Sequence, residues 1–573
     1  MATSSSEGDD LRDRSQQSTL ASQRAKEGGS ETQRRRGFGN MFPLGAKDGF
    51  NQWWASLSPA MTEHRVLSYI PLLQKPPTHT ETGSAPVSAS NSTMNVSSQD
   101  GEQLEQVTTN SINDPHGPRR WSSQMVHLSG KNRALNEFSI ERIGEPVEQN
   151  LVMLHGYGAG LGFFYKNFEG LSRAEGWKLY ALDMLGMGRS TRPKFEVHAK
   201  ERADQVIEAE SFFIDALEEW RVKKNLDRFT LLGHSLGGYL AVAYALKYPG
   251  HLNKLILASP VGIPEDPYAV NAAMPEPEDS TMANEFLQDQ NEAINNSNSN
   301  APKPGDNNNF LNARSKAAKS SSGTSTPATS EPPRKPLPGW LVYLWDKNIS
   351  PFSLVRWSGP LGPRLVSGWT SRRFSHLPNE EAQALHDYSY SLFRQPGSGE
   401  YALGRILAPG AFARSPLIRR IQGVGRQYIG PHSGPTVDAD APKDTKCHKT
   451  SKKSTDSTAA SITASDPDAP RVRETGIPVV LMYGEHDWMD IAGGYAAEEK
   501  IKQERARLLA NASEQEKRND HGSAKVVIIQ KAGHHVYLDG PEQFNQVMLE
   551  EMRDVMRRER MRTLQDGSSA AAS

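Results

Sequence analysis

One serine in this chain has the surroundings that nucleophilic catalysis needs. Ser235 stands at the centre of Gly-His-Ser-Leu-Gly, after an apolar run at 229–232 and before a stretch whose apolar residues recur at helical spacing. A strand, a sharp turn and a helix would lift the Ser235 hydroxyl off a sheet. The glycines two residues to either side fit this geometry, because a Cβ there would collide with the neighbouring strand and helix. We predict Ser235 as the nucleophile.

The acid of such a site is expected after a later strand. A serine hydroxyl is a poor nucleophile at neutral pH unless a base takes its proton and an acid orients that base. The apolar run 479–483 is followed by the carboxylates of Glu485, Asp487 and Asp490. We predict Asp487 as the acid. Asp490 and Glu485 stay open as alternatives, and Asp490 would also suit the N-cap of a following helix.

The base is expected in the loop after the last predicted strand, which spans 526–529. Two histidines, His534 and His535, follow that run. Triads of this kind occur in the chain order Ser, Asp, His, which is the order found here. We predict His534 as the base and expect the side chain of His535 to point elsewhere.

Two backbone amides are predicted to hold the oxyanion that forms when a serine attacks an ester. Leu236 begins the helix after the nucleophile, where the first N–H groups lack acceptors within the helix. Tyr157 lies in His-Gly-Tyr-Gly, after the apolar run 150–154. Removing one such donor costs on the order of 3 to 4 kcal/mol. His155 and Asp183 are expected to hold loops, with His155 kept as a possible accessory residue.

The composition of the chain excludes several kinds of binding site and cross-link. The chain has 573 residues, a formal net charge of -1 and 36% hydrophobic residues, so nothing in the charge indicates nucleic acid. A mean hydropathy of -0.63 indicates polar segments that dilute an ordinary core. The single cysteine, Cys447, excludes an intrachain disulfide and a Cys-rich zinc site. We expect no metal, no cofactor and no nucleic acid partner.

The elements that must position these residues alternate along the chain. Strands alternating with helices predict an α/β fold, with a mostly parallel sheet covered by helices on both faces. The predicted strands cover 125–128, 137–143, 150–154, 178–183, 229–232, 254–258, 479–483 and 526–529, and the clearest helices cover 203–220 and 541–562.

Polar stretches divide the chain into folded and disordered parts. Segments rich in Ser, Asn, Pro and Lys cannot bury a core and are predicted to be disordered. The predicted parts are a disordered tail 1–45, an amphipathic helical lead-in 46–75, a disordered linker 76–117, a first core half 118–265, a disordered insertion 266–338, a helical cap 339–430, a second disordered insertion 431–474, a second core half 475–565 and a tail 566–573.

The lead-in has two interpretations. Trp53, Trp54 and the apolar residues that follow have mostly helical spacing. The segment is either a helix that packs on the body of the protein or a helix that lies in a membrane interface with tryptophans at headgroup depth. No apolar run reaches the roughly 18 residues of a spanning helix, so we expect a soluble or membrane-peripheral protein.

With these motifs, the chain resembles the α/β-hydrolase-domain lipid enzymes, which include the fungal mitochondrial cardiolipin-specific phospholipase and the lysophospholipase and lysophosphatidic acid acyltransferase-like members. The resemblance covers roughly 121–562 outside the two insertions. It implies an α/β-hydrolase fold with an inserted helical cap and a phospholipid or lysophospholipid substrate. The motifs that carry it lie at 154–160, 233–241, 246–249, 357–363, 483–490 and 533–539.

The resemblance also bears on the reaction. It implies a serine hydrolase that deacylates glycerophospholipids of the cardiolipin type, at a membrane surface in the mitochondrion, with the cytoplasm or a lipid droplet as alternatives. In that family the pattern His534-x-x-x-x-Asp539 has been taken as an acyltransferase signature, so acyl transfer from acyl-CoA to lysophosphatidic acid is a rival. We expect Asp539 to anchor the loop of His534. A non-enzymatic scaffold that regulates a lipase is a second rival, and protein partners stay open.

Overall fold

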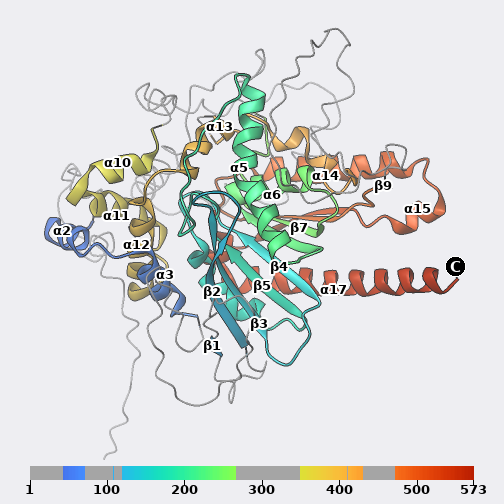
Figure 1. Cartoon of the computed structure of the whole chain (residues 1–573), viewed down its shortest axis with the longest axis horizontal. Helices are drawn as coiled ribbons and strands as arrows, with labels where there is room; N and C mark the ends of the chain where they lie inside the picture. The colour runs from blue at the N-terminus through green and yellow to red at the C-terminus, as the bar shows by residue number, and fades with distance from the viewer. Residues whose placement is uncertain are drawn as a thin grey trace, which may run out of the picture.

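The structure of this protein is a computed structural model, and its central feature is a twisted sheet (Figure 1). It describes residues 43–70, 107–108, 119–265, 349–408, 411–429 and 472–572, with side chains up to residue 564. Within these residues a nine-stranded sheet has the order β1-β2-β3-β5-β4-β6-β7-β10-β11, and β8 pairs with β9. The strands are β1 (Val107–Thr108), β2 (Arg119–His127), β3 (Ala134–Arg142), β4 (Gln149–Leu154), β5 (Trp177–Leu182), β6 (Phe229–His234), β7 (Leu252–Ala258), β8 (Tyr428–Ile429), β9 (Val472–Arg473), β10 (Pro478–Gly484) and β11 (Ser523–Ile529).

The strand predictions are confirmed. Strands β5, β4, β6, β7, β10 and β11 run parallel, whereas β1, β2 and β3 form an antiparallel edge. Parallel strands bring their carboxyl ends to the same edge of a sheet. The segments that follow β4, β6, β7, β10 and β11 therefore gather at one edge.

Helices cover both faces of the sheet. Alternate residues of β4 enter two separate hydrophobic clusters, with Val152 in one and Leu151 in the other, as the period of two in a strand requires. Leu217 of α5 packs in the first cluster and Met548 of α17 in the second. The helices of the core are α4 (Tyr165–Leu171), α5 (Arg202–Lys223), α6 (Leu236–Lys247), α14 (Ile491–Leu509), α15 (Glu514–Asn519), α16 (Val536–Asp539) and α17 (Pro541–Ala572).

The lead-in and the cap lie together although they are far apart in sequence (Figure 1). The lead-in helices are α2 (Ala46–Ala55) and α3 (Pro59–Leu67), and the cap contains α10 (Pro351–Trp357), the 3₁₀ turn η4 (Gly359–Leu361), α11 (Gly362–Arg373), α12 (Asn379–Phe393) and α13 (Leu403–Ile406). Helix α3 packs along α12, while α2 contacts α11 and η4. The two predicted segments therefore form one body.

Polar contacts fix the lead-in against the cap. Gln52 of α2 donates to Asp387 at 2.8 Å and accepts from His386 at 3.0 Å, and Arg65 of α3 donates to Asp387 at 2.8 Å. Burial raises the pKa of the Asp387 carboxyl, and hydrogen bonds from Gln383 and Gln52 and the charge of Arg65 oppose that rise. Such directional contacts hold α2 and α3 at a defined place on α12.

The structure shows the lead-in packed on the cap, whereas its interpretation as a membrane helix stays a prediction. Helix α3 packs on the protein body, with Val66 and Leu67 buried. Helix α2 instead leaves Phe50 46% exposed and Trp54 73% exposed. In the lead-in, α3 is therefore packed on the body of the protein, whereas α2 exposes large apolar side chains.

Helix α3 also places a carboxylate in the interior. Glu63 is 1% exposed and pairs with Arg189 at 2.5 Å. It also accepts hydrogen bonds from Asn136 at 3.1 Å and Tyr388 at 3.2 Å. A buried charge is tolerated only when its partners satisfy it, so this network joins the lead-in, the core and the cap.

We expect Glu63→Ala to lower the free energy of unfolding by about 3 kcal/mol, because Arg189 would then be left buried without its main carboxylate. Denaturant unfolding followed by circular dichroism measures the change. Met61→Ala is the matched control, since Met61 lies in the same helix and is 58% exposed, and it should stay within about 0.5 kcal/mol of the parent. Equal losses of unfolding free energy in the two variants would show that the Glu63–Arg189 pair stabilises the fold no more than an exposed side chain does.

The predicted segment boundaries are only partly covered by the described residues. The linker predicted over 76–117 contains strand β1, which pairs with Trp121 and Arg120 of β2; two residues are too few for a sequence signal. Residues 1–42 of the predicted tail 1–45, the rest of that linker, the predicted insertion 266–338 and residues 431–471 of the second predicted insertion lie outside the described residues. The prediction that the second insertion is disordered as far as 474 is wrong at its end, because Val472–Arg473 form β9 and pair with β8. The tail predicted over 566–573 continues α17 as far as Ala572. Among the described helices, none is both long and apolar enough to cross a bilayer.

Candidate active site

The candidate nucleophile occupies a strained turn between β6 and α6. Ser235 has φ 52° and ψ -116°, a backbone conformation that non-glycine residues rarely adopt. Its N–H donates to the carbonyl of Ala258 in β7 at 3.0 Å, and its own carbonyl accepts from Gly238 at 3.0 Å and Tyr239 at 3.1 Å. The turn is thus held by the neighbouring strand and by the helix that it begins.

The two glycines of the motif are required by close approaches. A Cβ on Gly233 would lie 2.3 Å from the carbonyl oxygen of Gly237, and a Cβ on Gly237 would lie 2.6 Å from that of His155. Backbone atoms cannot move aside as a flexible side chain can. The collisions predicted from the sequence are therefore the ones that the structure contains.

The predicted acid and base meet at the same sheet edge. His534 Nδ1 and Asp487 Oδ1 are 3.1 Å apart, and their side chains are 3% and 0% exposed. The amide of Met489 also donates to Asp487 Oδ1, at 3.0 Å. When the Nδ1–H of His534 donates to Asp487, Nε2 is left as the acceptor for a proton. This is the orientation that a general base for Ser235 needs.

The charge of Asp487 is stabilised where it lies. Burial alone would raise the pKa of its carboxyl, but the charge and hydrogen bond of His534, the Ser259 hydroxyl and the Met489 amide together lower it from its ordinary value. Asp487 therefore stays ionised at neutral pH. Because the pKa is lowered on folding, this carboxylate stabilises the fold above its unfolded pKa, and the contribution is lost as the pH falls through the folded value.

The alternative acids have other contacts. Asp490 is the N-cap of α14 and accepts from the amide of Ala492 at 3.0 Å. Glu485 accepts from the amide of Lys531 at 2.9 Å. The structure thus pairs His534 with Asp487 and leaves Asp490 and Glu485 in structural contacts.

The base lies against the turn of Ser235 between β6 and α6, which we call the elbow. The Nε2–H of His234 donates to the carbonyl of His534 at 3.1 Å, and the two imidazole rings are 4.8 Å apart. Within the described residues no hydrogen bond joins the Ser235 hydroxyl to His534, and such catalytic bonds commonly shorten only when substrate binds. The ring of His535 lies 4.9 Å from that of His234 and near those of Phe163 and Tyr537, while it is His534 that pairs with Asp487, as predicted.

The predicted oxyanion donors lie on either side of Ser235. Leu236 is the first residue of α6, so its N–H has no acceptor inside the helix. The loop of Tyr157 crosses over the nucleophile, because a Cβ on Gly156 would lie 3.0 Å from Ser235 Cβ. The ring of Tyr157 stacks on Phe352 of the cap at 4.9 Å.

His155 holds loops. Its Nδ1–H donates to the carbonyl of Gly156 at 2.7 Å, and its Nε2 accepts from the amide of Met184 at 3.1 Å. Burial lowers the pKa of the imidazole to about 4, so the ring is neutral. Asp183 likewise accepts from the amides of Leu161 and Arg189, both at 2.7 Å. These contacts fix the loops after β4 and β5 next to the site.

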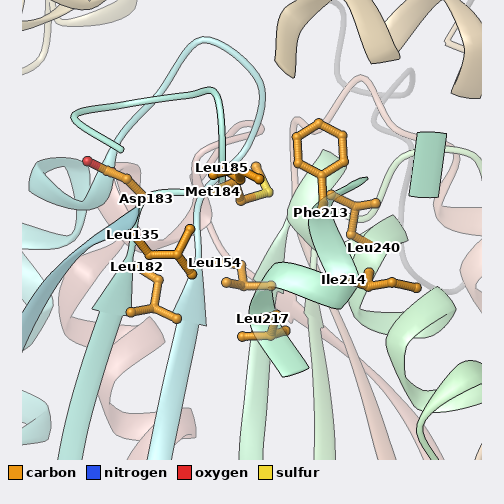
Figure 2. A pocket seen from close by; sticks show the side chains of 10 residues that line it. All are labelled: Leu135, Leu154, Leu182, Asp183, Met184, Leu185, Phe213, Ile214, Leu217 and Leu240. Carbon is orange, nitrogen blue, oxygen red and sulfur yellow. The ribbon is translucent and has the colours of Figure 1, made fainter. Parts of the chain in front are cut away.

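An apolar cavity of about 20 Å³ lies beneath these loops (Figure 2). Leucines of the sheet and of α5 and α6 line most of it, and the carboxylate of Asp183 points away from them. The space suits about one water-sized group, so it cannot receive an acyl chain. Among the described residues no cluster of three or more His, Cys, Asp or Glu side chains could hold a metal ion.

Sequence reasoning missed one neighbour of the acid and one of the base. Ser259 follows β7 at the same sheet edge and supports the charge of Asp487, and that position after a strand could have indicated it. Trp488 places its ring 4.7 Å from that of His534. An indole beside an imidazole excludes water and limits the ring's rotation, which no spacing rule predicts.

Known proteins resemble this chain in sequence. The family described as "alpha/beta hydrolase fold" matches residues 149–541. A protein of Arabidopsis thaliana named 1-acylglycerol-3-phosphate O-acyltransferase is 28% identical over 452 residues, which cover 78% of this chain and 75% of that protein. The human protein named 1-acylglycerol-3-phosphate O-acyltransferase ABHD5 is 28% identical over 405 residues, covering 70% and 76%.

Relatives with other names are also similar. The human protein named (lyso)-N-acylphosphatidylethanolamine lipase is 25% identical over 424 residues, which cover 72% of this chain and 83% of that protein. Among solved structures, the meta-cleavage product hydrolase CumD of Pseudomonas fluorescens is 13% identical, covers 75% of this chain and 97% of its own, and has a TM-score of 0.37. The chain belongs to the α/β-hydrolase fold family and is related to its lipid-metabolising members.

Proposed function

We propose that this protein is a serine hydrolase that deacylates glycerophospholipids. The observation that carries the proposal is the buried Asp487–His534 pair at 3.1 Å beside the strained turn of Ser235. A strained backbone conformation costs free energy, and it persists at functional sites where it positions a reactive group. In a turn of this kind the strain holds the serine hydroxyl above the sheet, where a substrate can reach it.

The proposed reaction has two halves. Ser235 Oγ attacks the carbonyl carbon of the ester while His534 Nε2 takes its proton, and the amides of Leu236 and Tyr157 hold the oxyanion. The carbon–oxygen bond to the lysolipid then breaks, and His534 returns the proton to the departing alkoxide. Water attacks the acyl-enzyme with His534 again as base, which releases the fatty acid and restores the serine hydroxyl.

Acyl transfer is the rival with direct support, because several relatives are named 1-acylglycerol-3-phosphate O-acyltransferase. In that reaction the acyl group of acyl-CoA would pass to the hydroxyl of lysophosphatidic acid. The same elbow serves both reactions if the acyl group first rests on Ser235, and the acceptor, water or lysolipid, then decides the product. The relative named as a lipase supports water as the acceptor.

Two measurements test the proposal. A fluorophosphonate probe should label Ser235, and mass spectrometry of the labelled peptide identifies the residue; an unlabelled Ser235 in folded protein favours a non-enzymatic scaffold. Purified protein is then given phospholipid vesicles, cardiolipin among them, or lysophosphatidic acid with labelled acyl-CoA. Release of free fatty acid supports hydrolysis, whereas label found only in phosphatidic acid supports the rival.

We also propose that the protein binds the surface of lipid membranes. Large apolar side chains remain exposed on α2, α10 and η4, and these elements adjoin one another. Two of them, Trp54 and Trp357, are 73% and 69% exposed, and tryptophan favours the headgroup region of a bilayer. We call this surface the apolar patch, made of Phe50, Trp54, Leu354, Trp357 and Leu361.

We expect Trp54→Ala together with Trp357→Ala to weaken binding to phospholipid vesicles by at least about tenfold, because burying a large aromatic side chain contributes roughly 1.5 to 3 kcal/mol. Vesicle co-sedimentation measures the affinity. Tyr428→Ala is the matched control, since Tyr428 is an aromatic residue of 51% exposure in β8, outside the patch. Hydrolysis of a short, soluble ester should be unchanged in both the double variant and the control. Unaltered vesicle binding by the double variant would contradict the proposal.

A mitochondrial location is proposed from the family resemblance, with cytoplasm and lipid droplet as alternatives. Fractionation of cells with protease protection of the full chain decides among them. Protection that is lost only when the outer mitochondrial membrane is opened would support the mitochondrion.

A further inference from the structure

The carboxylate of Asp539 closes the loop that carries the candidate base. Asp539 ends the short helix α16, and its Oδ2 accepts from the amide of Gly533 at 3.1 Å. Gly533 immediately precedes His534. Any shift of the Asp539 side chain therefore acts on the backbone amide of the residue that precedes His534.

Two side chains of the cap reach this same carboxylate. Arg373, the last residue of α11, places Nη2 3.7 Å from Asp539 Oδ2, and its side chain is 15% exposed. His376, in the segment after α11, places Nε2 3.6 Å from Asp539 Oδ1. The cap and the loop of the base thus meet at one carboxylate.

The guanidinium also lies near the elbow itself. The pKa of His234 is lowered first by burial and then by the neighbouring His534, and the positive charge of Arg373 adds to this effect. Arg373 therefore stands within electrostatic range of the residue that precedes Ser235. The cap contacts the loops of the site through Asp539 and through the Tyr157–Phe352 stack.

We infer that Arg373 is a positioning residue that acts through Asp539 to hold His534 in place, so that the cap must be docked for catalysis. This inference rests on the proposed function of Ser235 and His534. Arg373 Nη2 lies 3.7 Å from Asp539 Oδ2 without a hydrogen bond to it, so the contact acts through the opposite charges of two mostly buried groups. Without Arg373 the carboxylate would keep His376 and the amide of Gly533 but lose its guanidinium partner, and small displacements of a base lower the rate steeply.

In this role, Asp539 of the His-x-x-x-x-Asp pattern couples the position of the cap to the position of His534. It does not exchange protons with substrate. Arg373 could alternatively bind the phosphate of a phospholipid, since guanidinium groups match phosphate geometry. The two roles differ in the kinetic constant that they affect.

The test compares Arg373→Gln, Arg373→Lys and Asp539→Asn in the full chain, with the phospholipid vesicles that serve as substrate for the parent protein. We expect Arg373→Gln to lower kcat about tenfold with KM changed less than about twofold. Arg373→Lys keeps the charge and should recover most of kcat. The double variant Arg373→Gln/Asp539→Asn should be no slower than the worse single variant, because both changes remove one link.

Arg419→Gln is the matched control, because Arg419 forms an exposed ion pair with Glu265 at 2.9 Å between the segment after α13 and the core. It should keep kcat and KM. Thermal melting accompanies every variant; where Arg373→Gln melts below the assay temperature, the comparison of Arg373→Lys with the parent and the Asp539→Asn result decide instead.

Three results would overturn the inference: an unchanged kcat in Arg373→Gln, a raised KM with kcat preserved, or losses that add in the double variant. A raised KM would mark Arg373 as a phosphate contact. Failure of the proposed function looks different, since Ser235→Ala would then retain full activity whatever the Arg373 variants do.

Discussion

Ser235→Ala is expected to lower the release of fatty acid from phospholipid vesicles by at least about ten-thousand-fold. The nucleophile, base and acid of such a site act as a unit, and removing the serine of a triad elsewhere costs roughly a millionfold in kcat. The oxyanion donors and lipid binding would remain, so a small residual rate above water is expected. Fatty acid release, measured by mass spectrometry against heat-denatured protein, gives the rate.

The variant should fold as the parent does. Alanine keeps the Cβ of serine, so the strain at φ 52° is unchanged and the melting temperature should shift little. Ser68→Ala is the matched control, because Ser68 is exposed and its hydroxyl donates to the Arg65 carbonyl at 2.6 Å, away from the elbow. Hydrolysis by Ser235→Ala at the parent rate would refute the nucleophile.

Asp487→Asn is expected to lower kcat about a thousandfold to ten-thousandfold. The neutral amide cannot stabilise the imidazolium that forms when His534 takes a proton. Its NH₂ group would also face Nδ1 and favour the tautomer that places a proton on Nε2, the atom that must accept one. Initial rates of lipid hydrolysis at saturating substrate measure the effect.

The two other carboxylates of this loop provide the controls. Asp490→Asn should keep activity within a few-fold of the parent, and because asparagine is also a good N-cap, α14 should stay stable. Glu485→Gln should also keep activity, since its contact is with the amide of Lys531. A large loss in either control with an active Asp487→Asn would move the acid to that residue.

Much of the sheet could be predicted because its strands contain apolar runs. The run that ends in Tyr483 and the one that ends in Ile529 lie in β10 and β11, and Asp487 and His534 lie in the loops that follow these strands. The choice of acid could not be settled in this way. Asp487 and Asp490 are three residues apart in one loop, and only the path of the backbone decides which one faces His534.

The contacts of Glu63 and Arg373 could not be predicted from sequence patterns. A charge on an amphipathic helix usually faces water, so nothing in the sequence marks Glu63 as buried. Its partner Arg189 comes from a loop of the core that no periodicity relates to α3. Arg373 likewise meets Asp539 only because the cap folds back on the last loop. Contacts between distant segments depend on the tertiary fold, and one sequence alone does not show them.

The parallel pairing of β7 with β10 affects when the candidate active site becomes complete during folding. Leu255 lies opposite Val479 although the entire cap is encoded between them. Closing so large a loop loses chain entropy before any contact compensates it, so this pairing is expected to be slow. A ribosome completes the segment of Ser235 long before those of Asp487 and His534. The newly made serine hydroxyl is therefore expected to stay inert until the final strands join the sheet, which limits ester cleavage by incomplete chains.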